Sequence, residues 1–243
     1  MFYKDKYLKY KEKYIELKKE IILKGGKPVH YLNDMEEHPE ITSIDLSDVS
    51  YLTRIEDNFL SRCSRLKNIN VSPLSNVRTI GENFMRECNS LTSIDLSNLT
   101  QLYSIGNFFL CKCIGLRVIS INNLLEIRHL GNNFLSGCLN LSNFDLSNLR
   151  QLISIGDNFL MNCSSLSNID LSPLINISII NQGFLWGCSS LINIDISNLH
   201  NLTYIGQNFL RRCHNLRKII CTKNQKVMIL SLNPILEKYI VTI

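Results

Sequence analysis

Apolar residues recur along most of the chain with a period of 25 residues. The repeated unit reads L-x-x-I-x-L-S-x-L-x-x-L-x-x-I-G-x-N-F-L-x-x-C-x-x, and seven complete units run from Ile41 to Asn215. A unit of this length cannot bury a core alone, so each unit must stack on its neighbours. The pattern therefore predicts a repeat solenoid with one coil per unit. Three columns show the step most clearly: Cys63, Cys88, Cys113, Cys138, Cys163, Cys188 and Cys213; Phe59, Phe84, Phe109, Phe134, Phe159, Phe184 and Phe209; Ile55, Ile80, Ile105, Leu130, Ile155, Ile180 and Ile205.

Each unit contains one segment with the alternation of a short strand. In residues 91–96, Ile94 and Leu96 fall on one face, while Ser93 and Asp95 fall on the other. The apolar residues are expected to point inward. An eighth strand is expected to start at Leu216.

The remaining half of the unit is predicted to turn. Gly or Asn follows the Ile column in six of the seven units, and both residue types tolerate positive φ. A sharp chain reversal is therefore expected at this position. The segment N-F-L-x-x-C then suits a short turn of helix with Phe and Cys pointing inward.

The unit resembles the BspA-like class of leucine-rich repeats, in which an aromatic residue is followed four residues later by Cys and then by L-x-x-I. The resemblance covers residues 41–222. It implies a right-handed curved solenoid, or superhelix, with one short parallel strand per 25-residue coil. The commoner leucine-rich class has an Asn column three positions after L-x-L, whereas this chain has Leu there, as at Leu99 and Leu174. The turn after the strand must therefore be held in another way.

The chain outside the repeats is expected to form end structures, because terminal coils expose core. Residues 1–27 predict a basic amphipathic helix with a heptad seam of Tyr3, Tyr7, Tyr10, Tyr14, Leu17 and Ile21. Such a helix could dock on its own domain, self-associate, or lie on an anionic membrane. Residues 28–40 are expected to form a linker or N-terminal cap, and residues 223–243 a C-terminal cap.

The sequence of residues 3–20, YKDKYLKYKEKYIELKKE, also resembles an N-terminal segment that recurs in proteins of mimivirus-type giant DNA viruses. That resemblance implies a protein of infected host cytoplasm or of the virion. No run of 18 apolar residues and no apolar signal core is visible, so the expected location is cytoplasmic. The net charge of +5 is carried by residues 1–27, and the rest of the chain is neutral. A nucleic-acid groove along the repeats is therefore not expected.

The sequence offers no catalytic, cofactor or metal motif. Its five histidines fall at different positions of the unit, and the C-x-C of Cys111 and Cys113 has no second cluster at ligand spacing. We therefore expect no enzyme activity, no cofactor and no metal. The odd number of Cys in the regular column and the missing export signal favour free, buried thiols.

Two surfaces are candidate partner-binding sites. The first is an outward column of acidic residues on the strand face, Asp95, Asp145, Asp170 and Asp195, flanked by Asn143, Asn168 and Asn193. These groups could form a track for a basic peptide or a cation, or could simply hydrogen-bond one another and water. The second is the column that places Met161, Trp186 and Arg211 on the turn edge. Trp and Arg are favoured at interface hot spots, although this Trp could equally fold down on its neighbours.

Two functions follow from these features. The favoured one is a non-enzymatic protein–protein interaction scaffold that presents the strand face to an unidentified protein partner. The alternative is a structural or virion-assembly component that multimerises through the N-terminal helix.

Overall fold

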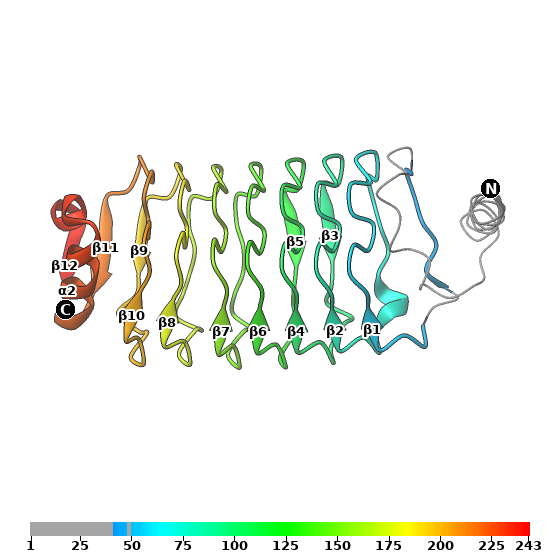
Figure 1. Cartoon of the computed structure of the whole chain (residues 1–243), viewed down its shortest axis with the longest axis horizontal. Coiled ribbons are helices and arrows are strands. Elements are labelled where there is room, and N and C mark those ends of the chain that lie inside the picture. The colour runs from blue at the N-terminus through cyan, green and yellow to red at the C-terminus, as the bar shows by residue number, and fades with distance from the viewer. Residues whose placement is uncertain (1–40, 48–49) are drawn as a thin grey trace, which may run out of the picture.

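The structure is a stack of similar coils along one axis (Figure 1). This computed structural model describes residues 41–47 and 50–243. The predicted helix of residues 1–27 and the linker of residues 28–40 lie outside the described residues. Every assigned strand pair in the stack is parallel, and between coils the register advances by one repeat, as in Ile80↔Ile105. The predicted solenoid is confirmed.

Strands occur in two rows rather than in one. The first row is the predicted segment L-x-x-I-x-L and comprises β3 (Ser93–Asp95), β5 (Val118–Ser120), β9 (Asn193–Asp195) and β11 (Lys218–Cys221). The second row, which the sequence analysis did not anticipate, ends at the Ile column. It comprises β1 (Arg54–Ile55), β2 (Thr79–Ile80), β4 (Ser104–Ile105), β6 (His129–Leu130), β7 (Ser154–Ile155), β8 (Ile179–Ile180) and β10 (Tyr204–Ile205). The second row follows the lower edge of the stack in Figure 1.

The first row is interrupted in the middle of the stack. β3 pairs with β5, and β9 pairs with β11, but residues 143–145 and 168–170 are not assigned to strands. Phe144, the one aromatic residue in a column of isoleucines, lies in this interval and packs tilted against Phe134. A short 3-10 helix, η3 (Ser72–Leu74), follows the corresponding segment of an earlier coil.

The segment N-F-L-x-x-C forms a third ladder and not the predicted turn of helix. Alternate residues have positive φ, as at Asn83 (56°), Met85 (49°) and Glu87 (61°). This alternation turns successive backbone groups toward opposite neighbouring coils. Asn83 N–H donates forward to Asn107 O at 2.8 Å, and Met85 N–H donates backward to Phe59 O at 2.8 Å. We call residues 57–63 and their equivalents at each 25-residue step the turn ladder.

A sharp chain reversal was predicted at the glycine after the Ile column because glycine tolerates positive φ, and that reason is wrong. Gly81, Gly106 and Gly131 are not among the residues with positive φ. They are needed because successive coils touch there: a Cβ on Gly106 would lie 2.7 Å from Gly81 C. The close approach lets each of these residues donate its backbone N–H to the coil before, as Gly106 N–H does to Ile80 O at 2.8 Å.

Asn181 stands in this glycine column, and the second row breaks there. Its Nδ2 donates to Ile155 O at 2.6 Å, in the place where other coils use the backbone N–H. The strands on either side, β7 and β8, are not paired, so the row divides into β1-β2-β4-β6-β7 and β8-β10. A side chain larger than hydrogen therefore separates the two coils, and its own amide replaces the lost hydrogen bond.

The core consists of continuous columns of like residues. The predicted inward Phe column is confirmed, since adjacent rings lie 5.0–6.2 Å apart. Beside it lies a second column of buried residues that all have φ of 49–55°: Leu60, Met85, Leu110, Leu135, Leu160, Leu185 and Leu210. A left-handed conformation costs such a residue about 1–2 kcal/mol, whereas burying its side chain contributes about 1.5–3 kcal/mol. Burial therefore more than offsets the strain.

The Cys column has a polar role in addition to filling space. All nine cysteines are free and buried. The thiol of Cys138 donates to Leu110 O at 3.2 Å, and the thiol of Cys113 donates to Met85 O at 3.0 Å. Each acceptor is the carbonyl of a left-handed residue in the previous coil, a pattern that runs from Cys88 to Cys213. The thiols thus add a second hydrogen bond to a carbonyl that already accepts a backbone N–H from its own coil, as Leu110 O does from Cys113 N–H at 3.3 Å.

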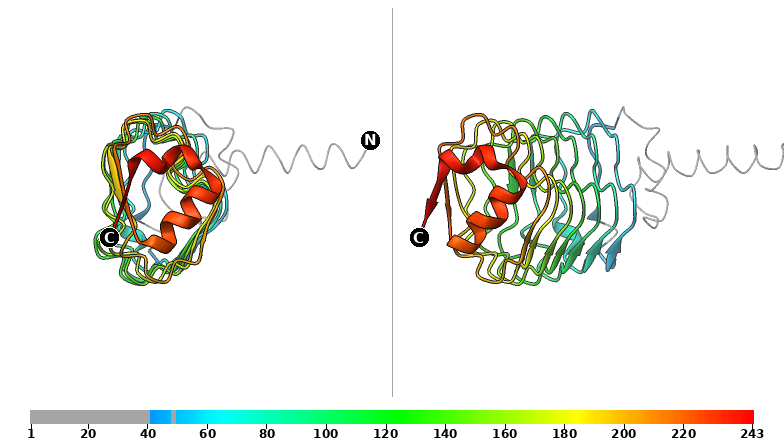
Figure 2. Two further views of the ribbon diagram at one scale, coloured as in Figure 1. Left: turned by 90° about the vertical axis from the view of Figure 1, so that its left-hand side faces the viewer. Right: turned by 60° about the vertical axis from the view of Figure 1, so that its left-hand side comes forward.

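The C-terminal segment covers the last coil (Figure 2). It contains α2 (Lys223–Leu232), the 3-10 helix η4 (Pro234–Tyr239) and β12 (Ile240–Thr242). Thr222 and Gln225 form a capping box at the start of α2, and the buried Gln225 Nε2 also donates to Ile196 O and Leu199 O. β12 pairs in parallel with β11 and so ends the first row.

Replacing Asn181 tests how the second row is held together. We expect Asn181→Ala to lower the free energy of unfolding by about 1–2 kcal/mol, because Ile155 O loses its donor while the Cβ still separates the coils. Asn181→Gly should be more stable than Asn181→Ala, because the backbone N–H can then take over the bond. Chemical denaturation of both variants measures the difference, and equal losses would contradict this role for Asn181.

The thiols should be unreactive in the folded protein. Burial raises the pKa of Cys213 to about 12 and also raises the pKa of Cys163, so neither thiol ionises near neutral pH. In a thiol assay at pH 8 without reductant, we expect no rapid reaction of the native protein. All nine thiols should react in guanidinium chloride. A lower count in denaturant would indicate disulfides, and a fast native thiol would contradict the buried column.

Candidate functional site

The acidic column of the strand face is built from Asx turns. Each Asp accepts the backbone N–H of the Ser two residues later, as Asp145 Oδ1 does from Ser147 at 2.8 Å and Asp170 Oδ1 from Ser172 at 2.8 Å. This local bond explains why the first row ends at the sequence D-L-S. Asn70 makes the same bond to Ser72 N–H at 3.0 Å, so an amide can substitute for the carboxylate.

The turns also affect the charge of the column. The Ser97 backbone N–H lowers the pKa of Asp95 below its usual value of 3.8. Because the folded pKa is the lower one, this contact adds stability above about pH 4, and the contribution is lost as the pH falls through the folded pKa. In each of the three adjacent residues Asp145, Asp170 and Asp195, the bond is made by Oδ1. Their Oδ2 atoms have no partner among the described residues and face solvent beside the exposed Asn143, Asn168 and Asn193.

Two of the three residues in the column of Met161, Trp186 and Arg211 are more buried than an interface role predicts. Met161 and Trp186 are half-buried, and Arg211 is exposed. The guanidinium of Arg212 lies 5.6 Å from the centre of the Trp186 ring, and Trp186 Nε1 is buried without a hydrogen-bond partner in the described part of the chain. The Trp is therefore folded against its neighbours, which was the alternative interpretation of this column.

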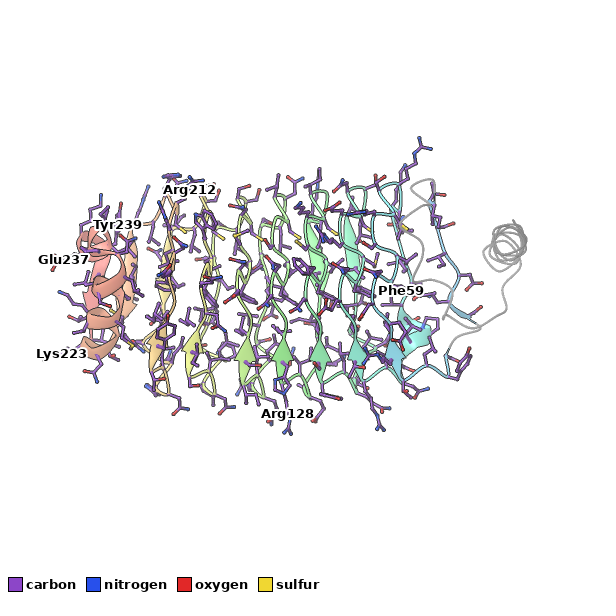
Figure 3. All side chains as sticks on the ribbon, in the orientation of Figure 1. Phe59, Arg128, Arg212, Lys223, Glu237 and Tyr239 are labelled. Atoms are coloured by element: carbon purple, nitrogen blue, oxygen red, sulfur yellow. The ribbon has the colours of Figure 1, made fainter. Side chains whose placement is uncertain are left out.

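A third surface, which the sequence analysis missed, follows the second row. Its outward residues include aromatic, branched apolar and basic side chains. Tyr204 is 52% exposed and Ile153 is 48% exposed. We call this surface the Tyr–Arg face and define it by Arg78, Tyr103, Arg128, His129, Ile153, Ile179 and Tyr204. Figure 3 shows Arg128 projecting from the lower edge of the stack.

A shallow hollow lies within the Tyr–Arg face. It has a volume of about 580 Å³ and is lined by Arg78, Tyr103, Arg128, His129 and Glu126, together with Thr100 and Gln101. Arg78 Nε donates to Gln101 Oε1 at 3.4 Å, and His129 Nδ1 shares a hydrogen bond with Ser154 Oγ at 2.8 Å. Two arginines against one glutamate make the hollow basic, while Tyr103 supplies apolar area.

The sequence contains a signal for this face. The columns that hold Tyr103 and His129 advance by the same 25-residue step as the core. The strand β4 at Ser104–Ile105 is not apparent from the repeat pattern, and without it the outward columns beside it do not stand out. The two predicted surfaces and the Tyr–Arg face are separate groups of columns, and the structure does not merge them into one site.

Other kinds of site find no support in the described residues. Across residues 41–47 and 50–243, no group of three or more His, Cys, Asp or Glu side chains is placed to hold a metal ion. Within the same residues, no helix is long and apolar enough to cross a membrane.

The chain belongs to the BspA type leucine rich repeat region family, which matches in six copies over residues 35–152 and 104–229. Proteins with leucine-rich repeats generally act in protein–protein interaction. No curated protein matches the chain.

Several solved structures have a similar fold. A T. pallidum leucine rich repeat protein is 20% identical with a TM-score of 0.57, covering 79% of this chain and 82% of that one. A functional domain of InlJ from Listeria monocytogenes, described as including a cysteine ladder, is 18% identical with a TM-score of 0.48. That match covers 75% of this chain but only 35% of the Listeria chain. A leucine-rich repeat protein from Bacteroides ovatus is 24% identical, with a TM-score of 0.41 and coverage of 74% and 59%.

Replacing Asp170 with Asn or with Ala tests how much the Asx turn contributes to stability. We expect Asp170→Asn to change the free energy of unfolding by less than about 0.5 kcal/mol, because the amide oxygen can still accept the Ser172 N–H. Asp170→Ala should cost about 0.5–1.5 kcal/mol, because that N–H loses its acceptor. Chemical denaturation compares the two variants, and equal stability would show that the turn bond contributes nothing.

Proposed function

We propose that this protein is a non-enzymatic scaffold that binds a protein partner through the Tyr–Arg face. The observation that supports this most directly is the group of exposed Tyr, Ile and Arg side chains along the second row of parallel strands. Tyr and Arg are enriched in protein interfaces, and a preformed surface loses little entropy on binding.

Charge suggests the chemistry of the partner. Arg78 and Arg128 flank Tyr103 in the hollow, and neither arginine forms an ion pair with another described residue. A partner with an acidic side chain next to an apolar one would match the hollow. Its carboxylate could accept hydrogen bonds from the guanidinium groups, which gives orientation as well as affinity.

The acidic column remains a second proposed surface. The Oδ2 atoms of Asp145, Asp170 and Asp195 form a line with a spacing of about 4.8 Å per coil, which suits a basic peptide or a cation. The Asx turns weaken this proposal, because one oxygen of each carboxylate already has a structural role.

The alternative function is a structural or virion-assembly component that multimerises through residues 1–27. It is supported by the heptad seam and by the resemblance of this segment to one found in giant-virus proteins. Sedimentation of the full chain against a chain starting at Pro28 tests this alternative, and loss of oligomers on truncation would favour it.

The scaffold proposal is tested by comparing two surfaces of the same protein. A partner is first identified by cross-linking the full chain in lysate of the source cells, and its affinity is then measured with purified proteins. We expect Tyr103→Ala combined with Arg128→Glu to weaken binding at least about tenfold, because both a central aromatic contact and its flanking charge are lost.

The matched control replaces Asp145 and Asp170 with Asn, which keeps the Asx turns and removes the acidic charge. Unchanged affinity in this control, together with weakened binding in the first variant, would support the Tyr–Arg face. The reverse result would assign binding to the acidic column and overturn the proposal.

A further inference from the structure

The turn ladder ends with unused hydrogen-bond donors at the last coil. In every earlier coil, two backbone N–H groups of this ladder donate to the following coil, as Asn158 does to Gln182 O at 2.8 Å and Asn162 to Trp186 O at 2.6 Å. Their equivalents in the last coil are Asn208 and Arg212. Among the described residues, neither of these N–H groups has an acceptor.

The other two rows are closed by the chain itself. β12 hydrogen-bonds to β11 at the end of the first row, and α2 packs across the end of β10 in the second. The left panel of Figure 2 shows α2 and η4 crossing the end of the stack. The turn ladder receives no equivalent strand from the C-terminal segment, and its end remains an open edge.

A cleft separates this open edge from the C-terminal segment. Its volume is about 450 Å³, enough for a few residues of extended chain but not for a whole coil. One side is formed by the turn residues Arg211, Arg212 and His214, and the other by Ile235 and Tyr239. Figure 3 places Arg212 and Tyr239 at the same end of the stack.

The cleft has the chemistry of an anion site. Two of its backbone N–H groups, those of Asn208 and Arg212, have no acceptor in the described residues, whereas Leu210 N–H donates backward to Phe184 O at 3.2 Å. Arg211 donates to Asn208 Oδ1 at 3.0 Å, and Arg212 lies over Trp186. Neither arginine forms an ion pair with a described residue.

The opposite end of the repeats carries the complementary charge in the same columns. Residues 33–38 read N-D-M-E-E-H and stand 25 positions before N-F-L-S-R-C at residues 58–63. Glu36 and Glu37 therefore belong to the columns that hold Arg211 and Arg212 in the last coil. The segment keeps the Asn and an apolar residue of the unit N-F-L-x-x-C, has Asp34 and His38 in place of its Phe and Cys, and carries acidic residues at the two variable positions.

We propose that the open edge at Asn208–Arg212 binds the acidic segment of residues 33–38 from a second copy of the chain. In the chain this segment lies only a few residues before Ile41, which belongs to the first coil at the far end of the stack, so a neighbouring copy must supply it. The contact joins two different surfaces and repeats from copy to copy, which produces head-to-tail chains rather than closed two-fold dimers. It involves neither the Tyr–Arg face nor residues 1–27.

Charge reversal on the full-length protein tests this contact. We expect the wild-type protein to show a sedimentation coefficient that rises with concentration at low ionic strength and falls to the monomer value in about 1 M salt, where screening is nearly complete. The variant with Arg211→Glu and Arg212→Glu should sediment as a monomer, because like charges then meet. The variant with Glu36→Arg and Glu37→Arg should do the same.

An equimolar mixture of the two variants provides the decisive measurement. Each contact in the mixture can again pair Arg with Glu, so assembly should return to the wild-type level. Restoration by mixing also rules out misfolding as the cause of the single-variant losses. A control variant with Arg65→Glu and Arg117→Glu, two exposed arginines on other surfaces, should assemble as the wild type does.

Three results would overturn the proposal. The first is a wild-type protein that stays monomeric at all concentrations in low salt. The second is assembly that persists in both charge-reversal variants, which would place the contact elsewhere, including residues 1–27. The third is a mixture that fails to reassemble although both variants keep the wild-type circular dichroism spectrum and melting temperature.

Discussion

The stack depends on hydrogen bonds that the N–H groups of left-handed residues in the turns donate to the neighbouring coils. The alternation of φ turns one peptide group toward the coil before and the next toward the coil after, as Phe108 N–H bonds to Asn132 O and Leu110 N–H to Phe84 O. The conformation is unfavourable for a leucine in isolation, and it persists because the side chain is buried and the backbone is paired. The thiol of the next coil completes the arrangement by binding the leucine carbonyl, as Cys138 does at Leu110. Phe, Leu and Cys are thus parts of one repeating contact.

Much of the fold could be predicted from the sequence because the period is long, regular and dominated by apolar residues. Column identity determines which residues cover one another, and this does not depend on the local backbone. The local backbone itself could not be obtained in this way. Positive φ at Leu110 runs against residue preference, and only the hydrogen bonds from both neighbouring coils make it favourable. The glycine column was interpreted through conformational freedom, whereas the reason for glycine at Gly106 is the close approach of Gly81.

The candidate sites, like the fold, could be predicted from the sequence only in part. The sequence located the acidic column correctly, since Asp145, Asp170 and Asp195 are outward and one coil apart, but it could not show that Ser147 and its equivalents occupy one oxygen of each carboxylate. Trp186 was identified as unusual, yet its packing under Arg212 depends on a residue from the neighbouring coil. The Tyr–Arg face required knowledge of the second strand row. The candidate binding surfaces of a repeat protein can therefore be identified only when it is known which residues of every coil point outward.

The break beside Asn181 has a mechanical consequence. The second row is interrupted between β7 and β8, while the turn ladder stays continuous there through Leu185 N–H and Phe159 O at 3.0 Å. At this level the turn ladder is therefore continuous from coil to coil, whereas the second row is not. The stack therefore bends most easily at that level, with the turn ladder as its pivot. Bending would swing Tyr204 on one segment relative to Tyr103 on the other, so the span of the surface could adjust to a bound protein without unfolding either segment.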